Sequence, residues 1–310
     1  MITTLAGGVG AARFLTGLVQ VAAPAEITAV VNVGDDLVLH GLHISPDIDT
    51  VTYTLAGAVN PETGWGLVGE TWQAMDGVAR YGGATWFRLG DRDLATHLYR
   101  TGRLAEGADL ATVTAEITAA WGVGVRIVPM SNDPVRTIVT VAEGDISFQE
   151  YFVARRHSVE VSAVRFDGAD RATPAPGVLD AILGAEVVVV APSNPIVSIA
   201  PILAVPGVRA AVVARRDRTV AVSPIIAGAA LKGPADRLLR ELGHESSVVG
   251  VARLYAEFAS VLVIDEADAD RAGDVEAAGV RCVVAPTIMR TPDAAAALAR
   301  TALAAVRRVS

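Results

Sequence analysis

Short apolar runs alternate with segments of helical periodicity along most of this chain, and this alternation limits the possible folds more than any other feature. The runs, each closed by a turn-forming or charged residue, are Ile2–Ala6, Ile27–Val33, Val125–Pro129, Val187–Ala191, Ala210–Ala214, Val261–Ile264 and Val280–Ala285. Runs without clean polar–apolar alternation are typical of strands buried on both faces of a sheet. The clearest helical patterns are Ala11–Val19, Val178–Leu183, Pro195–Leu203, Ala235–Leu242 and Ala294–Val306. The alternation predicts an α/β protein with a doubly wound, mostly parallel, Rossmann-like sheet.

The stretch between about residue 60 and residue 173 follows a different pattern. It contains all four tryptophans, and its helical segments come before its strand-like segments. These segments are, in order, Leu67–Arg80, Leu110–Ala120, Thr137–Val141, Ile146–Val153 and Val159–Phe166. We therefore expect residues 61–173 to form a smaller inserted cap domain that contributes to the substrate site. Residues 1–60 and 174–310 are then expected to form the nucleotide-binding core.

Composition and charge exclude several classes of protein. Apolar residues make up 52% of the chain and charged residues 19%, which provides a large buried core and excludes disorder. The net charge of −8 argues against a nucleic-acid partner, and the single cysteine, Cys282, excludes a disulfide framework or a thiolate zinc cluster. The longest apolar stretch, residues 196–214, is interrupted by prolines and an arginine, which argues against a membrane span. We expect a cytoplasmic protein without a secretory signal or a membrane partner.

A glycine-rich turn follows the first apolar run. Gly7, Gly8 and Gly10 let backbone N–H groups approach a phosphate, and the helix that follows, which carries Arg13, adds a favourable dipole. The turn is not a clean dinucleotide fingerprint, because Arg13 stands where a small residue is expected. It is not a P-loop either, since the chain has no Gly-Lys-Ser/Thr and its only lysine, Lys232, is remote in sequence. A tight turn with close helix–strand packing is the alternative interpretation.

Two acidic turns come after the second apolar run. The first contains Asp35 and Asp36, and the second contains Asp47 and Asp49 at the expected start of a helix. Carboxylates spaced in this way are suited to Mg²⁺, which proteins bind through one or two carboxylates together with substrate phosphates. Solvated turns and helix capping are the alternatives for these residues.

Two further polar segments complete the set. Ser193, Asn194 and Ser198 follow a strand-like valine run beside a proline that opens a helix, so this turn can bind an anion or can simply cap the helix. The segment 85–97 gathers aromatic, guanidinium and carboxylate groups before a helix, a set that can stack a planar ring or form ordinary ion pairs. The histidines in and beyond this segment, His97 included, show no zinc-ligand spacing.

Five of these motifs together resemble the 2-phospho-L-lactate transferase family, in the order in which that family carries them. They are the Gly7–Gly10 turn with Arg13, Gly34-Asp35-Asp36, the segment 46–50, the segment 86–93 and the segment 191–195. The resemblance extends from Met1 to residues 286–290 and implies a Rossmann-like core with an added smaller domain. It also implies an Mg²⁺-dependent transferase that joins the deazaflavin precursor FO to an enolpyruvyl or lactyl diphosphoguanosine. GMP is released, and the pathway is the biosynthesis of coenzyme F-420.

The resemblance also implies roles for individual residues. Asp35 and Asp49 would be catalytic or metal-binding carboxylates, and Asp49 and Arg88 would lie against the deazaflavin. Family relatives often carry lysine where this chain has Arg88, which retains the charge with a different geometry. The glycine turn with Arg13, and Ser193, Asn194 and Ser198, would bind the diphosphate of the GDP-like donor. Asp49 or no protein group would act as the general base, and Asp49→Asn should lower turnover by orders of magnitude.

Two other functions remain open at this point. A non-catalytic regulator that binds a nucleotide or nucleotide sugar could use the same fold. A nicotinamide oxidoreductase is disfavoured by the interrupted glycine pattern. The sequence does not distinguish the enolpyruvyl from the lactyl donor, and a homodimer is the expected oligomer because it is the commonest one.

Overall fold

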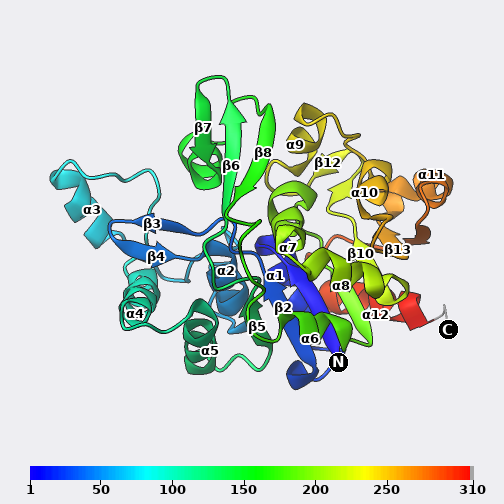
Figure 1. The fold of residues 1–310 in the computed structure, drawn as a ribbon, viewed down its shortest axis with the longest axis horizontal. Coiled ribbons are helices and arrows are strands. Elements are labelled where there is room, and N and C mark those ends of the chain that lie inside the picture. The colour runs from blue at the N-terminus through cyan, green and yellow to red at the C-terminus, as the bar shows by residue number, and fades with distance from the viewer. Residues whose placement is uncertain (308–310) are drawn as a thin grey trace.

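A seven-stranded parallel sheet forms the centre of the protein, in the order β14-β13-β10-β9-β1-β2-β5 (Figure 1). The computed structural model describes residues 1–307. The strands of this sheet are β1 (Ile2–Ala6), β2 (Ile27–Val31), β5 (Arg126–Pro129), β9 (Val187–Val190), β10 (Thr219–Val222), β13 (Val261–Ile264) and β14 (Arg281–Val284). The five inner strands are buried along their whole length, as the near-continuous apolar runs predict. The predicted α/β fold with a parallel sheet is confirmed.

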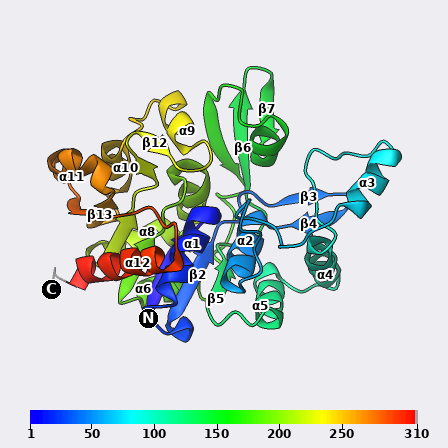
Figure 2. The same ribbon diagram turned by 180° about the vertical axis from the view of Figure 1, so that it is seen from behind.

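Helices cover both faces of this sheet. Helices α1, α2 and α12 lie on the face toward the viewer in Figure 2, and α6, α7 and α8 lie on the opposite face, which Figure 1 shows. The helices of the described chain are α1 (Val9–Leu18), α2 (Pro46–Leu55), α3 (Gln73–Arg80), α4 (Asp93–Ala105), α5 (Leu110–Ala120), α6 (Val178–Leu183), α7 (Ala200–Ala204), α8 (Val208–Ala214), α9 (Ala235–Glu241), α10 (Val248–Tyr255), α11 (Ala272–Ala277) and α12 (Pro292–Arg307). The apolar face of α1 packs against both α2 and α12.

One predicted strand is wrong. Residues 210–214 form the end of helix α8, and the strand of the sheet is β10, which the apolar-run pattern missed. A run of this length does not distinguish a strand from one turn of a buried helix. Gly207, with φ +85°, sets the start of α8, whose residues Val208, Ala211 and Val212 are buried. The predicted helix 195–203 is also divided, into a π-helical turn (Pro195–Ile199) and α7.

The chain between β2 and β5 leaves the sheet and returns to its edge. It forms the hairpin β3 (Leu37–Leu39) and β4 (Leu42–Ile44), and then helices α2 to α5. A small apolar cluster of Ile44, Met75 and Leu89 holds the projecting part, where the hairpin and α3 extend away from the sheet (Figure 1). The predicted helix 67–80 is confined to α3, its last eight residues.

A second excursion follows β5. Strands β6 (Arg136–Val141), β7 (Gly144–Ser147) and β8 (Ala163–Asp167) form an antiparallel sheet in the order β7-β6-β8. The predicted strand 146–153 ends at Ser147, and residues 150–154 form a π-helical turn. Because β5 belongs to the central sheet, the range 61–173 contributes one strand to the core as well as the two excursions.

The remaining regular elements are short. A two-stranded hairpin, β11 (Ile225–Ile226) and β12 (Ala229–Ala230), follows β10. Single 3₁₀ turns lie at Pro24–Glu26 and Arg216–Arg218, and a 3₁₀ segment with a kink at Asp268 spans Glu266–Arg271. Within residues 1–307, no single helix is long and apolar enough to cross a membrane. The segments Pro195–Ala204 and Val208–Ala214 reach that length and apolarity only together, and they are bent by 96°.

Candidate functional site

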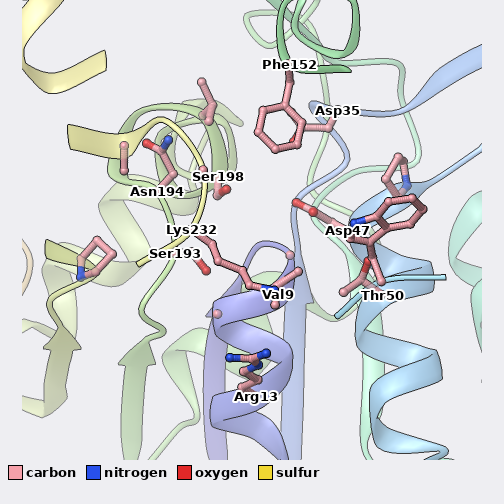
Figure 3. A pocket seen from close by; sticks show the side chains of 18 of the residues that line it. Val9, Arg13, Asp35, Asp47, Thr50, Phe152, Ser193, Asn194, Ser198 and Lys232 are labelled. Carbon is pink, nitrogen blue, oxygen red and sulfur yellow. The ribbon is translucent and has the colours of Figure 1, made fainter. Parts of the chain in front are cut away.

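A pocket of about 410 Å³ opens at the carboxyl ends of the central strands, where the core meets the two excursions (Figure 3). The turns that follow β1, β2, β9 and β10 contribute Gly8, Asp35, Ser193 and Ser223 to its wall. Helices α2 and α4 and the turn after β7 contribute the opposite wall. This is the edge of a parallel sheet at which open α/β proteins bind their ligands.

The glycine turn is held against the turn that follows β9. The backbone N–H of Gly7 donates to Ser193 Oγ at 3.2 Å, and a Cβ on Gly10 would lie 2.0 Å from the carbonyl oxygen of Pro192. Only glycine allows so close an approach at position 10. No side chain caps α1, so its first turn keeps N–H groups for a ligand at the wall of the pocket.

The turn after β9 combines capping with unused polar groups. Asn194 Oδ1 accepts a hydrogen bond from the N–H of Ile196 at 3.0 Å, which is the capping role considered above. Ser198 is buried, and its hydroxyl has no hydrogen-bond partner among the described residues. All three predicted residues of this turn, Ser193, Asn194 and Ser198, line the pocket.

Asp35 and Asp47 form a buried acidic pair beside the glycine turn. Burial and the charges of Asp47 and Asp36 raise the pKa of Asp35 well above its usual value, and Asp35 Oδ1 has no hydrogen-bond partner among the described residues. Burial raises the pKa of Asp47 to about 6, although Asn32 Nδ2 donates to Asp47 Oδ2 at 3.0 Å. The other oxygen of Asp47 faces Gly8, since a Cβ on that glycine would lie 2.8 Å from it.

Asp49, two residues further along α2, belongs to a different buried network. The guanidinium of Arg100 donates to both carboxylate oxygens of Asp49, from Nη1 to Oδ2 at 3.1 Å and from Nη2 to Oδ1. Burial by itself lowers the pKa of Arg100, but the charge of Asp49 reverses the shift and raises it. Neither Asp47 nor Asp49 caps α2, so the capping alternative does not account for them.

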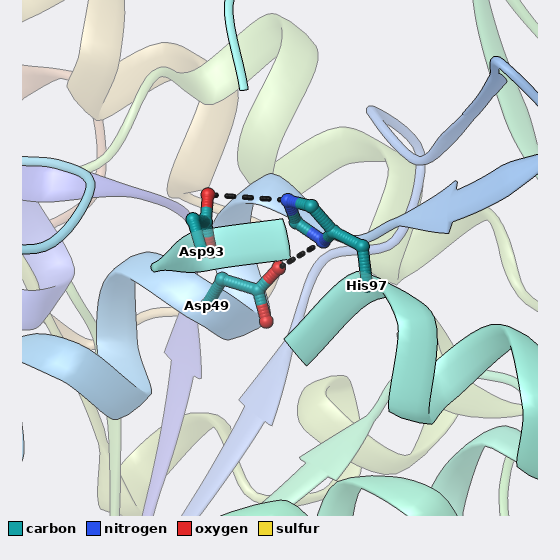
Figure 4. A group of neighbouring side chains, drawn as sticks. All are labelled: Asp49, Asp93 and His97. Atoms are coloured by element: carbon teal, nitrogen blue, oxygen red, sulfur yellow. Dashed lines mark ion pairs between the residues drawn. The ribbon is translucent and has the colours of Figure 1, made fainter. Parts of the chain in front are cut away.

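His97 and Asp93 extend this network along α4 (Figure 4). His97 Nδ1 lies 3.4 Å from Arg100 Nη1 and 3.8 Å from Asp49 Oδ2, while Nε2 lies 3.1 Å from Asp93 Oδ2. Because a guanidinium only donates, Nδ1 is the acceptor in the contact with Arg100, while Nε2 faces Asp93. The hydroxyl of Tyr53 donates to Asp93 Oδ1 at 2.5 Å.

The structure therefore offers two groups of possible metal ligands. Ligand atoms of Asp49, Asp93 and His97 lie within 4.8 Å of one another, but Arg100 already neutralises Asp49. Asp35 and Asp47 have no cationic partner among residues 1–307; burial raises the pKa of both, and the charge of Asp47 further raises that of Asp35. A divalent cation would relieve that repulsion and would satisfy the unpaired oxygen of Asp35. The donor chemistry of this second group fits Mg²⁺.

Aromatic rings form two parts of the pocket wall. The guanidinium of Arg88 lies 4.5 Å above the ring of Trp72 and 3.7 Å from the carboxylate of Asp76. On the other excursion, Phe148 and Phe152 stack at 5.6 Å with an interplanar angle of 10°. Phe87 and Arg88 line the pocket on one side and both phenylalanines line it on another, so flat side chains lie on two of its sides.

A comparison with known proteins assigns the family. The family model described as 2-phospho-L-lactate transferase CofD matches residues 2–286. The chain belongs to the 2-phospho-L-lactate transferase family. Relatives named phosphoenolpyruvate transferase are similar over nearly the whole chain. The Streptomyces griseus protein is 49% identical over 97% of both chains, the Streptomyces coelicolor protein 46% identical over 99% of this chain and 98% of its own, and the Mycolicibacterium smegmatis protein 41% identical over 97% of both.

Solved structures support the fold of this transferase. A member of the UPF0052 family from Bacillus halodurans matches with a TM-score of 0.64 and 18% identity, covering 97% of this chain and 98% of its own. At that level of identity the likeness concerns the fold alone. The resemblance inferred from the five motifs is thus confirmed at the level of family and of fold.

The pocket of this transferase brings together most of the residues that the sequence singled out. The predicted residues in its wall are Gly8, Gly10, Arg13, Asp35, Asp49, Arg88, Ser193, Asn194 and Ser198. Gly7 lies beneath the wall, bonded to Ser193. Asp35 and Asp49, which are predicted to share a metal, both line the pocket, and the carboxylates whose charges raise the pKa of Asp35 are those of Asp47 and Asp36.

Several residues of the pocket have no individual role in the sequence-based prediction, although Asp93 and His97 lie in the segment 85–97. Asp93, His97, Phe152 and Lys232 all line it, and Arg100 supports it from behind. Asp93 and His97 are one helical turn apart on α4, a spacing that places both side chains on the same face of the helix. Nothing near Lys232 in the sequence indicated its position.

Proposed function

We propose that this transferase moves an enolpyruvyl-bearing phosphoryl group from a diphosphoguanosine donor to the terminal ribityl hydroxyl of the deazaflavin FO. GMP is released, and the product is an intermediate in coenzyme F-420 biosynthesis. The names of relatives at 41–49% identity favour the enolpyruvyl donor over the lactyl donor. The reaction needs a site that binds an anionic diphosphate and a planar ring side by side.

One observation carries the proposal: the pocket divides into two chemically different sides. The uncapped first turn of α1, Ser193 and the basic residues Arg13 and Lys232 form one side, and the acidic residues of α2, of which Asp47 adjoins the glycine turn, form the other (Figure 3). The first side suits the phosphates of the donor. The second side suits a divalent cation and the hydroxyl groups of the acceptor.

The transfer places demands on position and charge. The acceptor oxygen forms a bond to the phosphorus that bears the enolpyruvyl group, and the bond from that phosphorus to the oxygen of GMP breaks. The electron pair leaves with GMP, and the hydroxyl proton passes to a base or to water. Phosphoryl transfer of this kind depends mainly on alignment and on neutralising phosphate charge. The N–H groups at the start of α1 and the side chain of Arg13 supply part of that neutralisation.

The residues that would hold Mg²⁺ are Asp35 and Asp47, which carry uncompensated oxygen atoms beside the glycine turn. Bound there, Mg²⁺ would neutralise charge on phosphate oxygens. Asp49 takes a different part in this proposal. A carboxylate has about four acceptor sites, of which Arg100 uses two. Asp49 thus remains able to accept a hydrogen bond from the ribityl chain of the acceptor.

The acceptor ring fits the aromatic part of the pocket. Arg88 is held over Trp72, and its neighbour Phe87 lines the pocket as well. The motif resemblance implies that Asp49 and Arg88 contact the deazaflavin, and the presence of both residues in the wall of one pocket supports this assignment. The ring would then lie toward α3 and α4, with the ribityl chain directed toward Asp49.

The decisive experiment incubates the purified protein with FO, Mg²⁺ and each of the two donors. We expect release of GMP and a deazaflavin product heavier by the enolpyruvyl phosphate group, detected by mass spectrometry. Chelation of Mg²⁺ should stop the reaction. Absence of GMP release with both donors would rule the proposal out. Tight GDP binding without turnover would instead favour a non-catalytic nucleotide-binding regulator.

A further inference from the structure

The only lysine of the chain, Lys232, lies beside the glycine turn. It follows the β11–β12 hairpin, and its side chain extends toward Val9 at the start of α1 (Figure 3). Lys232 Nζ lies 3.4 Å from the position that a Cβ on Gly64 would take, and Nη2 of Arg13 lies 3.7 Å from the same position. Two cationic side chains therefore converge at the wall of the pocket.

Neither cation has an acidic partner among the described residues. Lys232 Nζ donates one hydrogen bond, to the carbonyl oxygen of Thr63 at 3.0 Å. The guanidinium of Arg13 forms no hydrogen bond and no ion pair with any described residue. Burial and the positive charge of Arg13 lower the pKa of Lys232. Two neighbouring cations without a carboxylate between them favour the binding of an anion.

The surroundings of the two cations supply further donors for the same anion. The first turn of α1 has no side-chain cap. The hydroxyl of Ser198, which is buried and has no partner among the described residues, lies 2.7 Å from the position of a Cβ on Gly7. These donors come from α1, from the turn after β9 and from the segment after β12. Together they can bind an anion whose charge extends over more than one group. A diphosphate matches that extent.

We propose that Lys232 and Arg13 form an anion clamp over the first turn of α1, and that this clamp binds the diphosphate of a nucleoside diphosphate ester. The inference rests on the proposed function and names the residues that grip its donor. Arg13 offers a planar set of donors, and Lys232 offers a compact charge. Because Lys232 also binds the Thr63 carbonyl, the clamp fixes the segment around Gly64 next to the bound phosphates.

Calorimetric titration at a fixed Mg²⁺ concentration tests the clamp with guanosine, GMP, GDP and inorganic pyrophosphate. For Lys232→Gln, we expect the affinity for GDP and for pyrophosphate to fall about tenfold or more, because hydrogen bonds to charged groups are lost. The affinity for guanosine should not change. Lys232→Arg should retain most of the affinity. Lys232 is exposed, so the variants are expected to fold.

A matched control is Arg171→Gln, which makes the same change of net charge at an exposed position outside the pocket wall. It should bind GDP as the unaltered protein does. The clamp is overturned if Lys232→Gln binds GDP and pyrophosphate with normal affinity, or if its affinity for guanosine falls by the same factor as its affinity for GDP. If the unaltered protein binds both anions through Lys232 but transfers nothing from either donor, the clamp stands and the proposed function fails.

Discussion

Asp49 on α2 and Arg100 on α4 form a bidentate ion pair that is buried on both sides. Arg100 also donates to the carbonyl oxygen of His43 on β4 at 3.3 Å, so its side chain joins three elements behind the pocket. Arg100, which lies outside the pocket, thereby holds the carboxylate of Asp49, which reaches the pocket, in one orientation. This pair links the stability of the excursion to the geometry of the site.

Replacing Arg100 by methionine should lower the free energy of unfolding by about 3–5 kcal/mol, because Asp49 then remains buried without the guanidinium that hydrogen-bonds both of its oxygens. Denaturant titration measures the loss. The control is Arg209→Met, which breaks the exposed pair of Arg209 with Glu257 and should cost less than about 1 kcal/mol. Equal losses in the two variants would contradict the importance assigned to burial.

Asp49→Asn should lower turnover at least about 10²-fold, the range for loss of a positioned charged group that receives or orients a proton. The side chain keeps its shape but no longer balances the charge of Arg100, so stability should fall as well. Turnover is therefore measured below the unfolding temperature of the variant. Near-normal turnover in a folded Asp49→Asn protein would remove Asp49 from the mechanism.

Mg²⁺ should stabilise the unaltered protein, by about 2.7 kcal/mol at a concentration 100 times its dissociation constant. The effect should disappear in Asp35→Asn, because Asp35 presents the unpaired oxygen, and should persist in Asp49→Asn. Thermal unfolding with Mg²⁺ and with a chelator distinguishes the two. The reverse pattern would assign the ion to the group formed by Asp49, Asp93 and His97.

Asp47 predicts a dependence of stability on pH. Burial raises its pKa from 3.8 to about 6, so the folded protein binds this proton more tightly than the unfolded chain does. The stability that the proton contributes is complete below about pH 4 and is lost as the pH rises through about 6. Relative to the unaltered protein, Asp47→Asn should therefore gain up to about 3 kcal/mol between about pH 4 and pH 7.

Asp109 provides a control of opposite sign. Hydrogen bonds from Thr112 lower the pKa of this helix-capping residue. The stability that its ionised carboxylate contributes is therefore present above the pKa of Asp109 in the unfolded chain and is lost as the pH falls. Asp109→Asn should become relatively less stable as the pH rises. Denaturant titrations at several pH values measure both variants, and parallel curves for the two would contradict the assignment for Asp47.

Gly10→Ala should destabilise the protein by about 1–3 kcal/mol, because the added methyl group would overlap the carbonyl oxygen of Pro192. The displacement should also separate the glycine turn from Ser193 and weaken GDP binding. Gly102→Ala is the control: it adds the same group within α4, where nothing lies within 4 Å. It should stabilise the protein by about 0.5–1 kcal/mol. Stability and GDP affinity that match the unaltered protein in Gly10→Ala would contradict the close approach.

Much of the fold could be predicted from local patterns. The strands β1, β9 and β13 lie where the apolar runs place them, because a strand buried on both faces needs a continuous apolar stretch. The same rule failed at residues 210–214. Those residues belong to α8, because a short apolar segment between a glycine and an arginine can be buried as one face of a helix.

The sequence by itself determined most strands of the central sheet, the glycine turn after β1 and the order of the polar turns that follow the strands. These features depend on neighbours in the chain, through backbone sterics and the period of side-chain burial. Tertiary structure alone decided that Arg100 neutralises Asp49, that the charge of Asp47 acts on Asp35, and that Lys232 lies beside Arg13. Charges interact across space, so their partners are settled only when distant segments pack together at one edge of the sheet.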